Sequence, residues 1–233
     1  NEVQMIYYYF DLTLLLLLLI VLLYVIQKEL RTDGKAVQYI VLSTVLTLAF
    51  KYNWGTPFWG LEYEDAYAFS FCSRQFSYNI YPSSFLVDAI TIGSLQEPIA
   101  MGTYGGHFIT YSTFLSIFTQ LFGWSFELLC IVNCAVSFFI MLILSLMFKT
   151  SKNWFIAPIL YCCAPIINVF TTCMLSETFS SFICLIFVFA FWRRNTWSVK
   201  FLKYIAFFVA LLCKRENLIL CIFPALDALL CLK

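Results

Sequence analysis

Charged residues are scarce in this sequence. Only 12% of its 233 residues are Asp, Glu, Lys or Arg, whereas a soluble domain usually carries about 25%. The 14 basic and 13 acidic residues nearly balance, which argues against the basic footprint of a nucleic-acid-binding protein. With 62% hydrophobic residues, the chain is also too apolar to be intrinsically disordered. These proportions indicate an integral membrane protein.

Residues that hold metals are few or are spaced unsuitably. The sequence has one histidine and no Cys-x-x-Cys or His–Cys spacing typical of a metal site. Most of the ten cysteines lie within apolar runs, where they behave as small hydrophobic residues, and only Cys72 lies in a clearly polar segment. We therefore expect neither a metal site nor a cofactor.

Long apolar runs make up most of the chain. A helix needs about 20 mostly apolar residues to cross the hydrocarbon core of a bilayer, and shorter helices cross where the membrane thins locally. Six runs approach or reach this length, and a seventh closes the chain: Tyr8–Gln27, Ala36–Tyr52, Ser125–Phe148, Trp154–Leu175, Glu177–Trp192, Lys200–Cys213 and Asn217–Leu232. We predict an all-α fold, a polytopic transmembrane bundle of about six or seven spans with a long outer loop that bears amphipathic juxtamembrane helices.

Basic residues gather in four clusters: Lys28/Arg31/Lys35, Lys149/Lys152, Arg193/Arg194/Lys200/Lys203 and Lys233. The positive-inside rule places all four in the cytoplasm, so the chain crosses the membrane an even number of times between Lys35 and Lys149. Ala36–Tyr52 and Ser125–Phe148 supply two crossings, and His107–Phe122 should therefore not span. Its alternating hydroxyl and apolar residues suit a helix that lies along the membrane surface or is wedged into a cavity; an ordinary short span is the alternative.

Residues 53–106 form the only long segment without a span. They hold five acids, Glu62, Glu64, Asp65, Asp88 and Glu97, and one base, Arg74. A loop of this length in a compact fold is usually functional or disordered, and its many aromatic residues argue against disorder. The stretch Glu64–Tyr78 predicts an amphipathic surface helix that places Ala66, Phe69, Cys72 and Phe76 on one side.

The acidic pair Glu64 and Asp65 allows two interpretations. Acids in the first turn of a helix are favoured by the helix dipole, so the pair can be purely structural. Alternatively, a carboxylate held near apolar walls outside the membrane gains basicity and serves as a general base. The spacing of the residues does not decide between the two.

Four short segments occur in an order found in one family of membrane enzymes: Glu64-Asp65-Ala66-Tyr67, His107-Phe108-Ile109-Thr110-Tyr111 with a helix running to Phe122-Gly123, Ser176-Glu177-Thr178, and Lys214-Arg215-Glu216-Asn217. In order and sidedness they resemble the GT-C superfamily of glycosyltransferases, most closely the branch of protein O-mannosyltransferases and the aminoarabinose transferase of lipid A. The resemblance covers roughly residues 36–232. The pair reads Glu-Asp where the family more often has Asp-Glu, and prolines after His107 and Glu177 are missing.

The resemblance implies transfer of a sugar from a polyprenyl- or dolichyl-phosphate donor to an acceptor at the outer membrane face. Asp65 is then the expected base, with Glu64 as its partner or as the base itself. The departing phosphate requires a fixed cation, and Arg215 suits phosphate best, with support from Lys214 and His107. Glu177 and Tyr67 are expected to bind the acceptor or the sugar.

Each of these residues also has a structural interpretation. Lys214 and Arg215 can extend from a helix end towards water, Glu177 can oppose the dipole at a helix start, and His107 can be a structural histidine. The chief alternative function is a non-catalytic membrane transporter or scaffold, for which helices broken at Pro158, Pro165 and Pro224 would form a substrate path. A third possibility is a degenerate relative that binds a lipid carrier.

The expected organisation has two parts. Residues 1–35 add a span and a cytoplasmic loop before the family's usual first span, and residues 36–233 form the GT-C-like transmembrane module, with its outer region at 53–124. Family members continue with further spans, so we interpret the chain as an N-terminal portion or as one subunit of a split enzyme. The outer loop lacks an Asn-x-Ser/Thr acceptor, which favours a bacterial inner membrane with the active site facing the periplasm over the endoplasmic reticulum.

Overall fold

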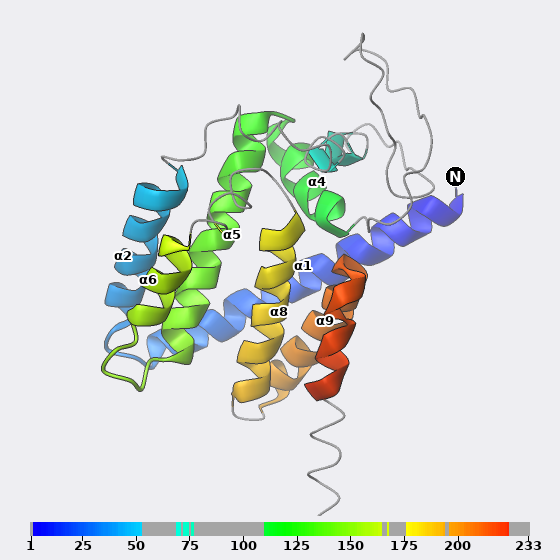
Figure 1. The fold of residues 1–233 in the computed structure, drawn as a ribbon. Helices are drawn as coiled ribbons and strands as arrows, with labels where there is room; N and C mark the ends of the chain where they lie inside the picture. The colour runs from blue at the N-terminus through cyan, green and yellow to red at the C-terminus, as the bar shows by residue number, and fades with distance from the viewer. Residues whose placement is uncertain are drawn as a thin grey trace, which may run out of the picture.

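A computed structural model describes residues 2–52, 69–70, 72–74, 76, 110–164, 167, 176–193 and 196–223. These residues are almost entirely helical and include no strand (Figure 1). The predicted all-α fold class is therefore confirmed for the part of the chain that the structure describes.

Two of the described helices are long and apolar enough to cross a membrane. They are α1 (Glu2–Arg31), with a candidate span at Met5–Arg31, and α5 (Phe126–Met147). Helix α5 is capped by Ser125, whose Oγ accepts a hydrogen bond from the backbone N–H of Leu128. Two further helices are apolar but shorter: α2 (Ala36–Leu46) and α8 (Ser176–Trp192). Helix α2 continues into the π-helix η1 (Thr47–Tyr52). The structure thus indicates membrane association, while the count of six or seven spans remains a prediction.

Helix α1 packs through one stripe of side chains. Its buried residues recur at intervals of three and four, at Tyr8, Asp11, Leu15, Leu18, Leu22 and Val25, as expected for one face of a helix. The opposite face exposes large apolar side chains such as Phe10 and Ile20, which suits contact with lipid. In Figure 1, α1 runs obliquely to α8 and α9 (Trp197–Cys213), and it contacts α4 and α9.

Helix α4 (Thr110–Phe122) is inserted between α1, α5 and α9, and eight of its 13 side chains are buried. Gly123, with a φ of 83°, ends it in the left-handed conformation that glycine adopts readily. The segment His107–Phe122 was expected to lie along the membrane surface or wedged into a cavity, with an ordinary short span as the alternative. Its described part packs among three helices, and its position relative to the membrane remains a prediction. Helix α4 is not among the candidate spans found in the described residues.

The predicted amphipathic helix of the outer loop is present where the structure describes it. Residues 69, 70, 72–74 and 76 are helical, and Phe69, Cys72 and Phe76 are all buried. The Phe76 ring lies 4.5 Å from that of Tyr8, and the Phe69 ring lies 5.1 Å from that of Tyr111. This short helix therefore rests on α1 and α4; Ala66 lies outside the described residues.

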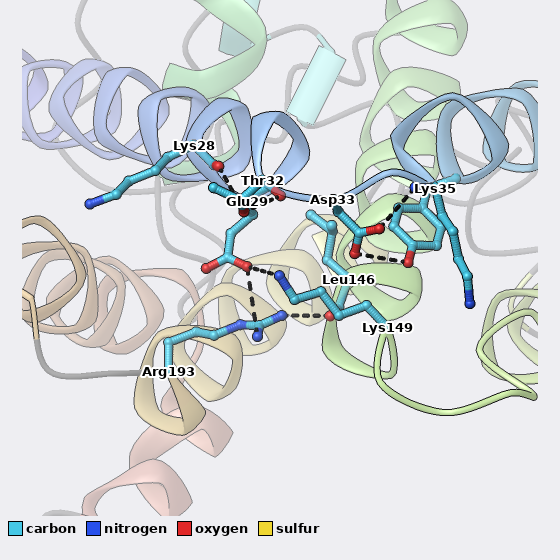
Figure 2. A network of polar contacts seen from close by, with 9 residues as sticks. Lys28, Glu29, Thr32, Asp33, Lys35, Leu146, Lys149 and Arg193 are labelled. Atoms are coloured by element: carbon cyan, nitrogen blue, oxygen red, sulfur yellow. Dashed lines mark hydrogen bonds and ion pairs between the residues drawn. The ribbon is translucent and has the colours of Figure 1, made fainter.

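Basic residues from three of the four clusters meet at one end of the bundle (Figure 2). The Glu29 carboxylate lies 2.7 Å from the Lys149 ammonium and 3.7 Å from the Arg193 guanidinium, which also donates to the Leu146 carbonyl. Lys28 and Lys35 lie in the same region. The ends of α1, α5 and α8 therefore meet at one end of the bundle, and the assignment of this end to the cytoplasmic side remains a prediction.

Two predicted spans differ from the structure. Within Trp154–Leu175, helix α6 covers only Ile156–Cys163, and Ala164 is already extended. A residue before proline is disfavoured in the helical region, so Pro165 accounts for this end. Within Asn217–Leu232 the described residues begin with a 3-10 helix, η3 (Arg215–Cys221), which turns back beside α8 and α9.

The Glu29 network generates a stability prediction. Glu29→Gln removes the shared carboxylate and leaves Lys149 and Arg193, each about one-fifth exposed, without their acid. We expect a loss of about 1–2 kcal/mol in the free energy of unfolding, seen as a lower midpoint in thermal unfolding of the detergent-solubilised chain. Lys152→Gln, a change at an exposed lysine of the same end, is the control and should unfold like wild type; equal midpoints for all three proteins would contradict the prediction.

The sidedness generates a second prediction. Cysteines introduced at Ser151 and Glu216, both exposed, should react from opposite sides of a sealed membrane because they lie at opposite ends of the bundle. Labelling by an impermeant maleimide, in a background with exposed Cys163 and Cys221 replaced by serine, measures this. Reaction of both positions from the same side would show that the arrangement is wrong.

Candidate functional site

The outer end of the bundle brings several helix termini together. Helix α8 begins there at Ser176, α4 begins at Thr110, and α9 ends there at Cys213. The Thr110 hydroxyl donates to the Leu212 carbonyl at 2.9 Å, which satisfies one of the carbonyls that a helix end leaves without an intrahelical partner. This hydrogen bond connects the start of α4 to the end of α9, next to the sequence motifs at residues 176–178 and 214–217.

An ion pair joins two of the predicted site residues. The Lys214 ammonium lies 2.5 Å from Oε1 of Glu177, and the two side chains are 26% and 36% exposed. Lys214 follows the C-terminus of α9 and Glu177 stands in the first turn of α8, where each charge is favoured by its helix dipole. The second Glu177 oxygen, Oε2, is buried and has no hydrogen-bond partner among the described residues, which leaves it able to accept a bond from a ligand.

Asn217 fixes the turn that carries Lys214. Its buried amide donates to the Ala210 carbonyl at 2.7 Å and to the Ser180 hydroxyl at 3.0 Å, and its oxygen accepts from the Cys184 thiol at 3.4 Å. Asn217 therefore joins η3 to both α9 and α8, the two helices that hold the ion pair. Sequence reasoning placed Asn217 in a motif but gave it no role.

A second polar contact lies deeper in the bundle. The Tyr111 hydroxyl donates to Oδ1 of Asn133 on α5 at 2.8 Å, and both residues are buried. Burial raises the pKa of Tyr111 above its ordinary value, an effect larger than the opposing effect of the Asn133 hydrogen bond, so the phenol stays neutral. Its ring centre lies 5.5 Å from that of Phe179, two residues after Glu177. Asn133 is a single amide side chain within an apolar run. This contrast with its neighbours is the sequence signal that could have pointed to the contact.

A groove of about 250 Å³ runs along α8 beside the ion pair. It is lined by Ile140 and Leu144 of α5, Tyr161 of α6, Ile167, and Glu177, Thr178, Ser181 and Leu185 of α8. Because Glu177 and Thr178 begin α8 and Leu185 lies two turns further along, the polar residues stand at one end and the apolar residues fill the remainder. This shape suits an amphiphilic ligand with a polar head and an apolar chain.

Asp11 is a buried acid that the sequence interpretation missed. It is 4% exposed and lies on the packed stripe of α1, between Tyr8 and Leu15. The Thr110 and Thr113 hydroxyls of α4 face its carboxyl, yet neither carboxylate oxygen makes a hydrogen bond among the described residues. The spacing of three and four between apolar neighbours was the signal that could have found it.

Several predicted site residues cannot be placed. Glu64, Asp65, Tyr67 and His107 lie outside the described residues, and of Arg215 only the backbone is described, as the first residue of η3. Their roles as base, phosphate ligand or sugar ligand remain predictions. Of the predicted residues, the structure brings together Glu177 and Lys214.

In the described part of the chain, no group of three or more His, Cys, Asp or Glu side chains is placed to hold a metal ion. Compared with family models, curated proteins and solved structures, the chain matches none.

The Asn217 contacts generate a prediction about the site's rigidity. Asn217→Ala removes two donated bonds and leaves the buried Ser180 hydroxyl and Ala210 carbonyl without their partner, so we expect a loss of about 2–3 kcal/mol in the free energy of unfolding. Thermal unfolding in detergent measures it. Leu218→Ala, which truncates a neighbouring side chain that is 60% exposed, should have little effect, and an equal loss in both variants would refute the role given to Asn217.

Proposed function

We propose that this protein is a membrane glycosyltransferase that moves a sugar from a polyprenyl-phosphate donor to an acceptor at the outer membrane face. The observation that carries the proposal is the apolar groove on α8 that ends at the Glu177–Lys214 pair. A lipid-linked sugar phosphate has the same division into a long apolar chain and a charged head. The bundle of six or seven spans and the bacterial inner membrane belong to this proposal.

In this proposal the isoprenoid chain lies along Ile140, Leu144 and Leu185, and its phosphate lies near Lys214. The phosphate leaves as an anion, and a cation fixed at the place where that charge develops stabilises the transition state. Lys214 pairs with Glu177, which lines the groove, and precedes the turn held by Asn217. Arg215 follows it in sequence and would add a planar donor that matches phosphate oxygens.

Glu177 has two roles in this scheme. Without a donor it neutralises Lys214, and a bound phosphate then competes for the same ammonium. Its second oxygen has no partner in the described structure and can accept a hydrogen bond from an acceptor or sugar hydroxyl. Glu177 thereby orients a substrate, and the base remains one of the acids of the outer loop.

The proposed base, Asp65 or Glu64, precedes in sequence a described residue that connects to this site. Asp65 precedes Phe69 by four residues, a length of chain that spans at most about 14 Å. The Phe69 ring contacts that of Tyr111, and Tyr111 contacts Phe179, two residues from Glu177. This connection supports a general base that takes the proton of the acceptor while the phosphate departs, with inversion at the anomeric carbon.

Asp11 favours a second candidate, a transporter without chemistry. Asp11 lies buried in an apolar helix, and ionisable residues within spans often mark ion or substrate paths. Uptake of a solute into proteoliposomes, lost in Asp11→Asn, would favour this candidate over the glycosyltransferase. A third candidate is a degenerate relative that binds a lipid carrier but has no activity. It would bind the polyprenyl-phosphate donor without transferring the sugar.

The decisive experiment measures sugar transfer from a labelled polyprenyl-phosphate sugar, together with binding of the unlabelled donor by native mass spectrometry. Asp65→Asn or Glu64→Gln should abolish transfer while donor binding is kept. Full turnover in both variants would exclude the proposed base, and failure of wild type to bind the donor would exclude the proposed function.

Lys214 provides the matching test at the phosphate end. We expect Lys214→Gln to lower kcat/KM about 100-fold, because a fixed charge that stabilises the departing anion contributes on the order of 3 kcal/mol. Lys203→Gln removes a lysine from the other end of α9 and serves as the control with unchanged kinetics. A Lys214 variant as active as the Lys203 variant would remove Lys214 from the site.

A further inference from the structure

A buried acid without a partner marks a second site, separate from the groove. Asp11 is 4% exposed, and both of its carboxylate oxygens lack a hydrogen-bond partner among the described residues. The Thr113 hydroxyl, fully buried on the facing helix α4, is likewise without a partner there. A charged group buried without compensation costs several kcal/mol, so two such neighbouring groups point to a species between them.

The hydroxyl of Thr110 favours a positively charged species at this place. Its single proton is donated to the Leu212 carbonyl at 2.9 Å, so the oxygen that faces Asp11 has only lone pairs to offer. The Asp11 carboxylate is also an acceptor. Two acceptors that face each other repel unless a proton or a metal cation lies between them.

The end of α9 adds negative potential at the same place. Leu212 and Cys213 are the last residues of α9, the Cys213 thiol lies near Asp11, and carbonyls at a helix C-terminus attract cations. The nearby ammonium of Lys214 is already paired with Glu177. Lys214 is therefore not paired with Asp11.

We propose that Asp11, Thr110 and Thr113, with the carbonyl end of α9, form a binding site for a small monovalent cation of the sodium type. One carboxylate balances one positive charge, and carboxylate, hydroxyl and carbonyl oxygens are the ligands that hard cations prefer. Carbonyls at helix ends bind sodium in the same manner within membranes. The site ties α1, α4 and α9 together and does not depend on the proposed glycosyltransferase activity.

The experiment compares thermal unfolding of the purified full chain in sodium chloride and in choline chloride at equal ionic strength. Choline is too large for a buried site of this kind, so the difference isolates sodium binding. For wild type we expect sodium at ten times its Kd to raise Tm by about 3 °C or more. Asp11→Asn should lose this shift, because the amide removes the charge while keeping the shape.

Two matched variants separate the site from a general salt effect. Thr113→Val should reduce the sodium shift, whereas Thr178→Val, which removes an equally buried and unpartnered hydroxyl on α8, should keep it. Glu127→Gln, at an exposed acid, should keep it as well. Equal Tm values of wild type in sodium and choline would overturn the proposal and leave a proton or a water between these groups; an undiminished shift in Asp11→Asn would overturn it too.

Discussion

The burial of helix α4 is the constraint on which the arrangement of this protein depends. Its packed face carries many hydroxyl groups, and a buried hydroxyl without a partner is costly. The partners come from three other helices: Tyr8 of α1 bonds to Ser116 and Gln120, Asn133 of α5 bonds to Tyr111, and the Leu212 carbonyl of α9 bonds to Thr110. Meeting these requirements fixes where α1, α5 and α9 come together, and so creates the polar outer end.

The same constraint explains why the ends of α8, α9 and α4 gather polar groups while the groove between α5 and α8 is mostly apolar. The start of α8 and the end of α9 lie side by side there, and their opposed dipoles favour an acid on one and a base on the other. Asn217 then fixes the connection between them. Further along, α8 and α5 face each other through apolar residues, which leaves a groove instead of a second polar layer.

Sequence patterns predicted those features that depend on local periodicity or on charge. The apolar runs located α1, α5, α8 and α9. The basic clusters predicted the end at which Glu29 meets Lys149 and Arg193. The even number of crossings expected between Lys35 and Lys149 set apart the segment that contains α4. Features that depend on distant contacts were not accessible: Asn133 and Asn217 acquire partners 22 and 37 residues away in sequence. The acids of the outer loop lie outside the described residues, so their roles rest on the motif order alone.

Glu29 and Glu177, two acids that form ion pairs in the described part of the chain, illustrate how a structural contact differs from a binding element. Glu29 is shared by two cations from two other helices, and one of these cations also bonds to a backbone carbonyl, so its charge is fully used in joining helices. Glu177 has one cation, keeps a buried oxygen without a partner and borders a groove. Because an unsatisfied buried acceptor is unfavourable, a ligand that satisfies it gains binding free energy that no ligand could gain at Glu29. The outer pair is therefore the one that can recognise a substrate.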